Sequence, residues 1–298
     1  MISKEEFISF CKEVIPEEEM TKYKKKTRNM WITLSCVLIA ELIAAIFIPM
    51  GFMFMPMLAI VSVVIIVLTM KYNTNEFKGK YSHKVLDCLL KGYSYTYNQH
   101  AYIDSSIYKN SGFGSTNYDS YTGEDFFKID IPKDDGSPSG TYLSLSDLHL
   151  TRQETYTDSQ GRRKTRTVTV YDGILGYVRF PFGFKCDLSL NVGFWGKEKI
   201  KLEDIKFNKK FRTYTNNQLE ALVILTPTLM TKLIALEERV GNLKLSLTEG
   251  GFLYLGISNE LFKINKPNEK AFEHYYNDIS NILGIVNEIK NNNKVFKM

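Results

Sequence analysis

The stretch Trp31–Met70 decides the fold of this chain, and it reads WITLSCVLIAELIAAIFIPM followed by GFMFMPMLAIVSVVIIVLTM. It contains one acidic residue, Glu41, and no basic residue. Each half has about 20 residues, which as a helix is about 30 Å long and matches the hydrocarbon thickness of a bilayer. Because Pro49 and Gly51 interrupt helical continuity between the halves, we predict a transmembrane hairpin of two antiparallel helices over residues 31–70.

Basic residues flank both ends of this predicted hairpin. Cytoplasmic flanks of membrane helices carry an excess of Lys and Arg, and the turn between the two runs carries none. We therefore expect a multi-pass protein of the cell membrane (the bacterial inner membrane) with both termini cytoplasmic. A cleaved signal peptide is disfavoured because the leader is long and charged. A buried pair of helices in a soluble protein is the remaining alternative. The flanking residues are Lys22, Lys24, Lys25, Lys26 and Arg28 before the hairpin, and Lys71, Lys78, Lys80 and Lys84 after it.

Glu41 lies near the middle of the first predicted span. A central acidic residue costs about 2.5–3.5 kcal/mol on insertion scales, and the surrounding Leu, Ile, Val and Phe return about 3–6 kcal/mol. A functional interpretation is a proton or ion relay, or an oligomer contact, in a small channel or transporter subunit. The structural interpretation is a protonated acid bonded to a hydroxyl such as Ser35 or Ser62. With only two spans per chain, the structural interpretation is favoured.

The composition outside the apolar stretch is that of a folded soluble protein. The chain as a whole is 44% hydrophobic and 24% charged, which is typical of globular domains. The net charge of +5 does not call for a nucleic-acid partner, although basic residues near a membrane favour anionic lipid. The cysteines have no paired spacing, so we expect reduced thiols and no metal site among them. They are Cys11, Cys36, Cys88 and Cys186.

Residues 1–30 are predicted to form a cytoplasmic, amphipathic N-terminal segment. Phe7, Phe10, Cys11 and Val14 recur at helical spacing, and Pro16 interrupts the pattern. The apolar face of this helix could lie on the membrane surface or on the folded domain.

Residues 71–298 are predicted to form a cytoplasmic α+β domain with antiparallel strands. A helix is expected from Asn75 to about Leu90, and a β pattern from Asp125 to Phe194. Within the latter, a turn at Asp134–Pro138 joins two strands. A second turn at Asp158–Gly161 closes a hairpin.

The tip of that second hairpin holds the most basic local cluster outside the leader. It could contact acidic lipid headgroups or an acidic partner. A solvated edge that discourages aggregation is the commoner explanation for such a cluster. The four residues are Arg162, Arg163, Lys164 and Arg166.

The C-terminal third is predicted to alternate helices and strands. Thr226 followed by Pro227 is typical of a capped helix start, and Gly241 of its end. Residues 243–247 and 252–257 then form a hairpin across Glu249–Gly251. A last helix begins at Pro267, and its apolar face is expected to hold Phe272, Tyr276, Ile279, Leu283 and Val286.

A tyrosine-rich stretch between Tyr93 and Tyr121 could serve as a stacking platform for nucleic acid. It has almost no Lys or Arg, which favours packing in the core and in turns instead. We therefore expect no nucleic-acid partner.

Several short motifs occur in a fixed order along the chain. They are Tyr121–Phe126, Leu145–Asp147, Phe207–Phe211, Leu225–Pro227, Gly251–Tyr254 and Leu261–Phe262. Together they resemble a bacterial family known only for a domain of unknown function numbered three thousand one hundred thirty-seven. Its members are similar to this chain in placing two spans before one soluble α+β domain. The resemblance covers roughly Phe77 to the C-terminus, and it implies an architecture but no activity and no catalytic residues.

Known catalytic and cofactor motifs do not occur in the sequence. There is no HExxH helix, GxSxG elbow, GxxxxGK loop or CxxC pair, and the four histidines fall in unrelated segments. Glu124 and Asp125 could be a carboxylate pair, yet neighbours on a strand point to opposite faces. We expect no cofactor and no metal.

The sequence favours a membrane-anchored interaction or scaffold protein whose cytoplasmic domain docks another protein. The alternatives are a membrane-tethered enzyme with a site built from dispersed residues, or a channel or transporter subunit using Glu41.

Overall fold

The computed structural model describes residues 2–47, 51–133, 136–193, 197–258, 269–292 and 295–296. The predicted hairpin turn at Pro49, part of the turn at Asp134–Pro138 and the predicted helix start at Pro267 lie outside these ranges. The chain divides into two compact units, and each is described by itself below. The smaller holds residues 2–89 and 263–274, and the larger holds residues 90–262 and 275–298.

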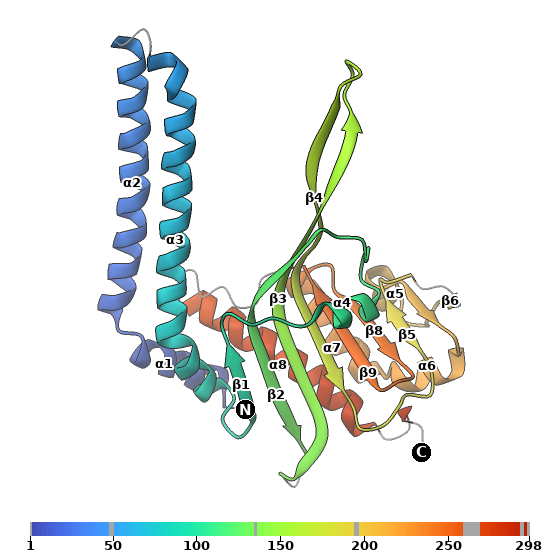
Figure 1. Ribbon diagram of the computed structural model, residues 1–298. Helices are drawn as coiled ribbons and strands as arrows, with labels where there is room; N and C mark the ends of the chain where they lie inside the picture. The colour runs from blue at the N-terminus through green and yellow to red at the C-terminus, as the bar shows by residue number, and fades with distance from the viewer. Residues whose placement is uncertain are drawn as a thin grey trace. The chain divides into compact units, whose positions relative to one another are not determined.

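The smaller unit contains three helices in succession, α1 (Lys4–Val14), α2 (Glu17–Phe47) and α3 (Gly51–Leu89) (Figure 1). Pro16 separates α1 from α2, as the sequence predicts. The basic leader is the first part of α2, which runs into the apolar stretch without a break. Likewise, the helix predicted from Asn75 is the C-terminal part of α3.

The apolar face of α1 is covered by protein. Its Phe7 and Cys11 are fully buried, and α1 contacts α3, where Val85 and Leu89 are also fully buried. Lys12 of α1 pairs with Glu269 at 2.9 Å. This packing buries part of the apolar face of α1, whereas Phe10 and Val14 are only half-buried.

Within the described ranges, no single helix is both long enough and apolar enough to span a membrane. One pair of consecutive helices meets the length and composition of a span when taken together. The pair is α6 (Gln218–Ile224) and α7 (Pro227–Val240), and the angle between the two helices is 74°.

The larger unit is built on an antiparallel sheet, so the predicted α+β class with antiparallel strands is confirmed. In the described residues nine strands follow the order β1-β2-β3-β4-β9-β8-β5-β7-β6. Figure 1 shows α4 (Ser105–Ser111) in front of this sheet and α8 (Glu269–Asn291) behind it. A short helix, α5 (Ile205–Lys210), precedes β7. The strands are β1 (Ser94–Asn98), β2 (Ser120–Pro132), β3 (Pro138–Thr157), β4 (Arg163–Arg179), β5 (Leu188–Leu190), β6 (Glu198–Ile200), β7 (Thr213–Thr215), β8 (Lys244–Thr248) and β9 (Phe252–Ile257).

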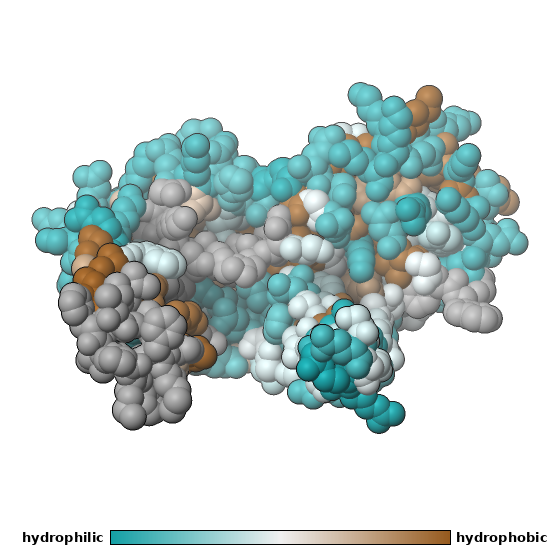
Figure 2. Space-filling model, turned by 90° about the horizontal axis from the view of Figure 1, so that it is seen from above, coloured by the Kyte–Doolittle hydropathy of each residue, from teal (hydrophilic) through white to brown (hydrophobic). Residues whose placement is uncertain are grey.

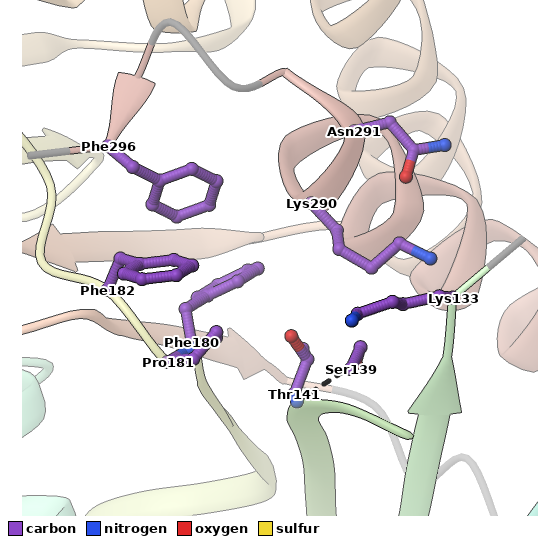
Figure 3. Close-up of a pocket in the computed structure, with 9 residues that line it drawn as sticks. All are labelled: Lys133, Ser139, Thr141, Phe180, Pro181, Phe182, Lys290, Asn291 and Phe296. Atoms are coloured by element: carbon purple, nitrogen blue, oxygen red, sulfur yellow. Dashed lines mark hydrogen bonds between the residues drawn. The ribbon is translucent and has the colours of Figure 1, made fainter. Parts of the chain in front are cut away.

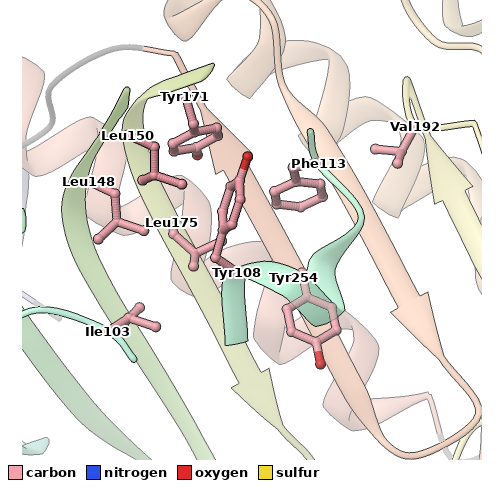
Figure 4. Packing of buried hydrophobic residues seen from close by; sticks show 9 residues of the cluster. All are labelled: Ile103, Tyr108, Phe113, Leu148, Leu150, Tyr171, Leu175, Val192 and Tyr254. Carbon is pink, nitrogen blue, oxygen red and sulfur yellow. The ribbon is translucent and has the colours of Figure 1, made fainter. Parts of the chain in front are cut away.

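Within the tyrosine-rich stretch, Tyr108 packs in the core, whereas Tyr102 is 43% exposed. Tyr108 of α4 is 1% exposed and lies against Tyr171, with the two ring centroids 5.3 Å apart. Figure 4 shows Tyr108 among apolar side chains of β3 and β4, including Leu150 and Leu175. Burial of a Tyr ring in such a cluster removes it from any stacking role on the surface.

Local signals place the C-terminal elements correctly. The Thr226 side chain accepts a hydrogen bond from the Leu229 amide, Pro227 is the first residue of α7, and Gly241 ends it. The β8–β9 hairpin has the predicted pairing, with Leu247 opposite Leu253. In α8 the prediction was wrong at one position, because Tyr275 is buried and Tyr276 is only partly so.

Candidate functional site

Glu41 contacts Ser62 across the α2–α3 pair. The Ser62 hydroxyl donates a hydrogen bond of 3.1 Å to Glu41 Oε1, whereas Ser35 donates instead to the Trp31 carbonyl at 3.0 Å. Glu41 Oε2 is buried and has no hydrogen-bond partner within the described part of the chain.

The basic hairpin tip lies at the end of a two-stranded ribbon, which we define as residues 152–169. Strand β2 pairs with β3 only as far as Thr151, and β9 pairs with β4 only from Ile174 onward. Between these limits β3 and β4 pair only with each other, for example Glu154 with Arg166. Among the described residues, no third strand pairs with the ribbon, although the Gln153 amide donates a hydrogen bond of 2.7 Å to the Asp119 carboxylate. A further strand can therefore add to its edges.

Acidic residues offset much of the basic charge on this ribbon. Asp158 pairs with Arg162 at 3.1 Å and with Lys164 at 3.0 Å. Arg166 pairs with Glu154 at 3.1 Å, and Arg163 forms no ion pair with any described residue. The Arg162 amide and then the Lys164 ammonium hold the pKa of Asp158 below its ordinary value. These pairs are exposed, so each contributes little to stability.

The structure corrects the expectation that Glu124 and Asp125 point apart. Asp125 has a φ of 59°, and the β2–β3 register shifts between Glu124 and Phe127. This β-bulge brings carboxylate oxygens of Glu124, Asp125 and Asp147 within 4.8 Å of one another. Asp125 is fully buried and accepts a hydrogen bond of 2.7 Å from the Tyr97 hydroxyl. Three carboxylates are oxygen ligands of the kind that Mg²⁺ and Ca²⁺ prefer.

A cavity of about 390 Å³ lies in the larger unit where the β2 end, the β3 start and the segment after β4 meet the end of α8. We call it the lysine–phenylalanine pocket. Figure 3 shows its phenylalanine rings on one side and its two lysines on the other. Its principal lining residues are Lys133, Thr141, Phe180, Phe182, Lys290 and Phe296.

The aromatic side of the pocket is held by close packing. Phe296 stacks on Phe184 with ring centroids 5.0 Å apart and lies 5.5 Å from Phe180. The Phe180 amide donates a hydrogen bond of 2.9 Å to the Gly251 carbonyl. A Cβ on Gly251 would lie 2.6 Å from the Phe182 carbonyl oxygen. Gly251 thus permits the close approach that positions this wall.

The polar side of the pocket combines two ammonium groups with hydroxyls. Lys290 donates a hydrogen bond of 2.7 Å to the Pro132 carbonyl, and the Ser139 hydroxyl accepts one of 3.0 Å from the Thr141 amide. Thr141 is 3% exposed, and its hydroxyl has no partner among the described residues. Figure 3 shows that this hydroxyl points toward the cavity.

Sequence reasoning missed both the carboxylate cluster and the pocket. Asp147 lies on a different strand from Glu124 and Asp125, and Lys133 lies far from Lys290 in the chain, so no spacing rule joins them. Of the residues singled out from sequence, Glu41 meets Ser62, and Glu124 meets Asp125. The four basic tip residues are adjacent, as expected, but they lie on the ribbon and apart from the pocket lining.

Residues 169–291 match the model of a family described as "Protein of unknown function (DUF3137)". The match begins within β4 and ends at the last residue of α8. It includes the motifs Phe207–Phe211, Leu225–Pro227, Gly251–Tyr254 and Leu261–Phe262, the last of which lies outside the described residues. Tyr121–Phe126 and Leu145–Asp147 precede it. No curated protein and no solved structure matches the chain.

Proposed function

We propose that this chain is a membrane-anchored interaction protein, in which α2 and α3 cross the lipid bilayer as a hairpin and the sheet-based unit binds another protein. A non-enzymatic role of this kind needs only an anchor and an exposed docking surface. Both features have support in the described residues.

The observation that carries the anchor is the exposure of large apolar side chains on α2 and α3. Trp31 and Ile39 of α2 are 53% and 57% exposed, and Ile60 and Leu68 of α3 are 64% and 60% exposed. Most of the exposed large apolar side chains among the described residues lie on these two helices, and Figure 2 shows brown apolar atoms there. Exposed apolar area on this scale is stable in lipid and is a liability in water.

The hydroxyl groups of the apolar stretch are satisfied in the way a bilayer requires. Thr33 donates to the Asn29 carbonyl at 2.9 Å, Ser35 to the Trp31 carbonyl at 3.0 Å, and Thr69 to the Ile65 carbonyl at 2.7 Å. Ser62 donates to Glu41. All four hydroxyls between residues 31 and 70 are thus bonded within the hairpin, so that none needs water.

Charged pairs between the two helices occur on the leader side of the apolar stretch. Lys26 pairs with Glu76 at 3.6 Å, and Lys80 pairs with Glu19 at 3.1 Å. Such a polar base next to an apolar hairpin fits the water boundary of a membrane. Its excess of Lys favours the cytoplasmic side for both chain ends.

The ribbon supports the docking role of the larger unit. Its distal residues are mostly exposed on both faces, and no strand other than β3 and β4 pairs with it in the described part of the chain. An extended segment of a partner protein could add to such an edge as a further strand.

Topology in a bacterial host tests the anchor. Reporter fusions at residues 1 and 298 should both score as cytoplasmic. In a chain whose own cysteines are replaced by alanine, Met50→Cys should react with an impermeant maleimide from outside, and Lys84→Cys, the matched control, should not. A C-terminus that is labelled from outside would refute the hairpin.

A further inference from the structure

We propose that the lysine–phenylalanine pocket binds a small organic monophosphate, with the phosphate at the lysine side and an apolar group against the phenylalanines. This inference is independent of the membrane anchor, because every residue it uses belongs to the larger unit. Nothing in the family match assigns a ligand to this pocket.

The polar side has the chemistry of an anion site. Figure 3 shows the Lys133 and Lys290 ammonium groups on the same side of the cavity as Thr141. The carbonyl of Pro132 accepts one hydrogen bond from Lys290 at 2.7 Å and fixes the position of this ammonium, which has three donors in all. Two ammonium groups match the charge of a phosphate monoester better than that of a single carboxylate.

Thr141 is the observation that points to a ligand rather than to a surface crevice. Thr141 is 3% exposed, and its hydroxyl has no hydrogen-bond partner in the described part of the chain. A buried hydroxyl without a hydrogen bond destabilises a fold, and an isosteric apolar side chain would avoid that cost. A phosphate oxygen in the cavity would accept from this hydroxyl.

The opposite wall accounts for the apolar part of the ligand. Phe180 and Phe296 are almost fully buried, whereas Phe182 is 59% exposed at the pocket. The rings of Phe182 and Phe296 lie 6.2 Å apart. A cavity of about 390 Å³ falls within the range usual for small-molecule sites. Inorganic phosphate alone would leave this wall without contacts.

Calorimetric titration of the full chain in nanodiscs of zwitterionic lipid tests the proposal. Phenyl phosphate is the probe, with inorganic phosphate and phenol as its two halves. We expect phenyl phosphate to bind at least tenfold more tightly than either half. Competition with a short-chain phosphatidic acid then distinguishes the sources of the ligand. Displacement of phenyl phosphate by this lipid indicates a lipid headgroup, and lack of displacement indicates a soluble monophosphate.

Variants assign the binding to this pocket. Lys133→Gln and Thr141→Val should each weaken phenyl phosphate binding about tenfold or more, since each removes a donor to a charged group. Thr213→Val is the matched control, because Thr213 is also buried with a hydroxyl that lacks a partner in the described chain, and it lies outside the pocket lining.

Both valine variants should keep the Tm of the unliganded chain or raise it, which separates loss of binding from misfolding. Of these two variants, only Thr141→Val should reduce the increase in Tm that phenyl phosphate produces. Absence of binding to the unmodified chain, or binding that Lys133→Gln and Thr141→Val leave unchanged, would overturn the proposal.

Discussion

Asp125 adopts a left-handed backbone conformation, which is uncommon for a residue other than glycine. The bulge that it creates in β2 turns its carboxylate into the same cluster as those of Glu124 and Asp147. The Tyr97 hydroxyl donates to the buried Asp125 at 2.7 Å. At the scale of single residues, this hydrogen bond compensates for the burial of the Asp125 carboxylate.

Tyr97→Phe should therefore lower the free energy of unfolding by about 1–3 kcal/mol, because a buried carboxylate loses a donor. Chemical denaturation of the full chain measures the change. Tyr156→Phe is the control: Tyr156 is 42% exposed, so loss of its hydroxyl should have almost no effect. Equal free energies of unfolding for the two variants would show that the Tyr97–Asp125 hydrogen bond does not contribute to stability.

Glu41 has a partner within its own chain, which favours the structural interpretation. Glu41→Gln should leave the abundance of the protein in the membrane and any cellular phenotype unchanged, because the amide still accepts the hydrogen bond from Ser62. Quantification of the membrane-bound protein alongside the phenotype checks this outcome. A lost phenotype at normal abundance would support a proton or ion relay instead.

Residue types alone could not reveal these contacts. The rule that strand neighbours point to opposite faces holds for regular strands, and it fails at Asp125 because of the bulge. Sequence offered Ser35 and Ser62 as alternative partners of Glu41, and the structure shows that Ser62 is the one in contact. Lys133 and Lys290 could not be paired, because only the tertiary fold brings the ends of β2 and α8 together.

At the scale of elements, the ribbon turn depends on a charged acceptor. The pKa of Asp158 is lowered, mainly by the Arg162 amide, so its stabilising effect is present above its ordinary pKa and is lost as pH falls through the lowered value. The Gln160 and Arg162 amides both donate hydrogen bonds to Asp158 Oδ1. Their protection from hydrogen exchange should therefore decrease when the pH is lowered below about 4, the ordinary pKa of an aspartate. Asp158→Asn should remove this dependence on pH, whereas unchanged protection in acid would contradict the role of the charge.

The ribbon should bind anionic membranes only slightly. Each basic residue near an anionic leaflet contributes about 1 kcal/mol, but Glu154 and Asp158 engage three of the four tip cations. Figure 2 shows the tip as hydrophilic. The full chain in zwitterionic nanodiscs should therefore sediment weakly with anionic vesicles.

Charge variants test that expectation. The tip variant changes Arg162, Arg163, Lys164 and Arg166 to Gln, and the control changes four other lysines to Gln, which alters the net charge equally. Strong, salt-sensitive sedimentation that only the tip variant abolishes would reassign the ribbon to membrane recognition. The control lysines are Lys199, Lys201, Lys206 and Lys209.

Elements with local signals were predictable from the sequence. The Thr226–Pro227 start of α7 and the Asp158–Gly161 turn depend on neighbouring residues, and both are in place. Strands β5 and β7 have three residues each and no pattern that marks them. The pairing of β4 with β9 joins distant segments, so only the complete sheet shows it.

At the scale of the whole molecule, the account depends on one claim, that the exposed apolar sides of α2 and α3 face lipid. Sequence gives the length of the apolar runs, and the structure adds that Ile60, Val64 and Val67 are exposed. A water-soluble protein would cover side chains of this kind with another element.

Spin labels placed one at a time at Ile60, Val64 and Val67, in the full chain reconstituted into liposomes, test this claim most directly. Collision with dissolved oxygen, which concentrates in lipid, is compared with collision with a water-soluble nickel chelate. The account predicts high accessibility to oxygen and low accessibility to the chelate at all three positions, and the reverse at the exposed Lys84 of α3. Chelate accessibility at Ile60, Val64 and Val67 equal to that at Lys84 would contradict it.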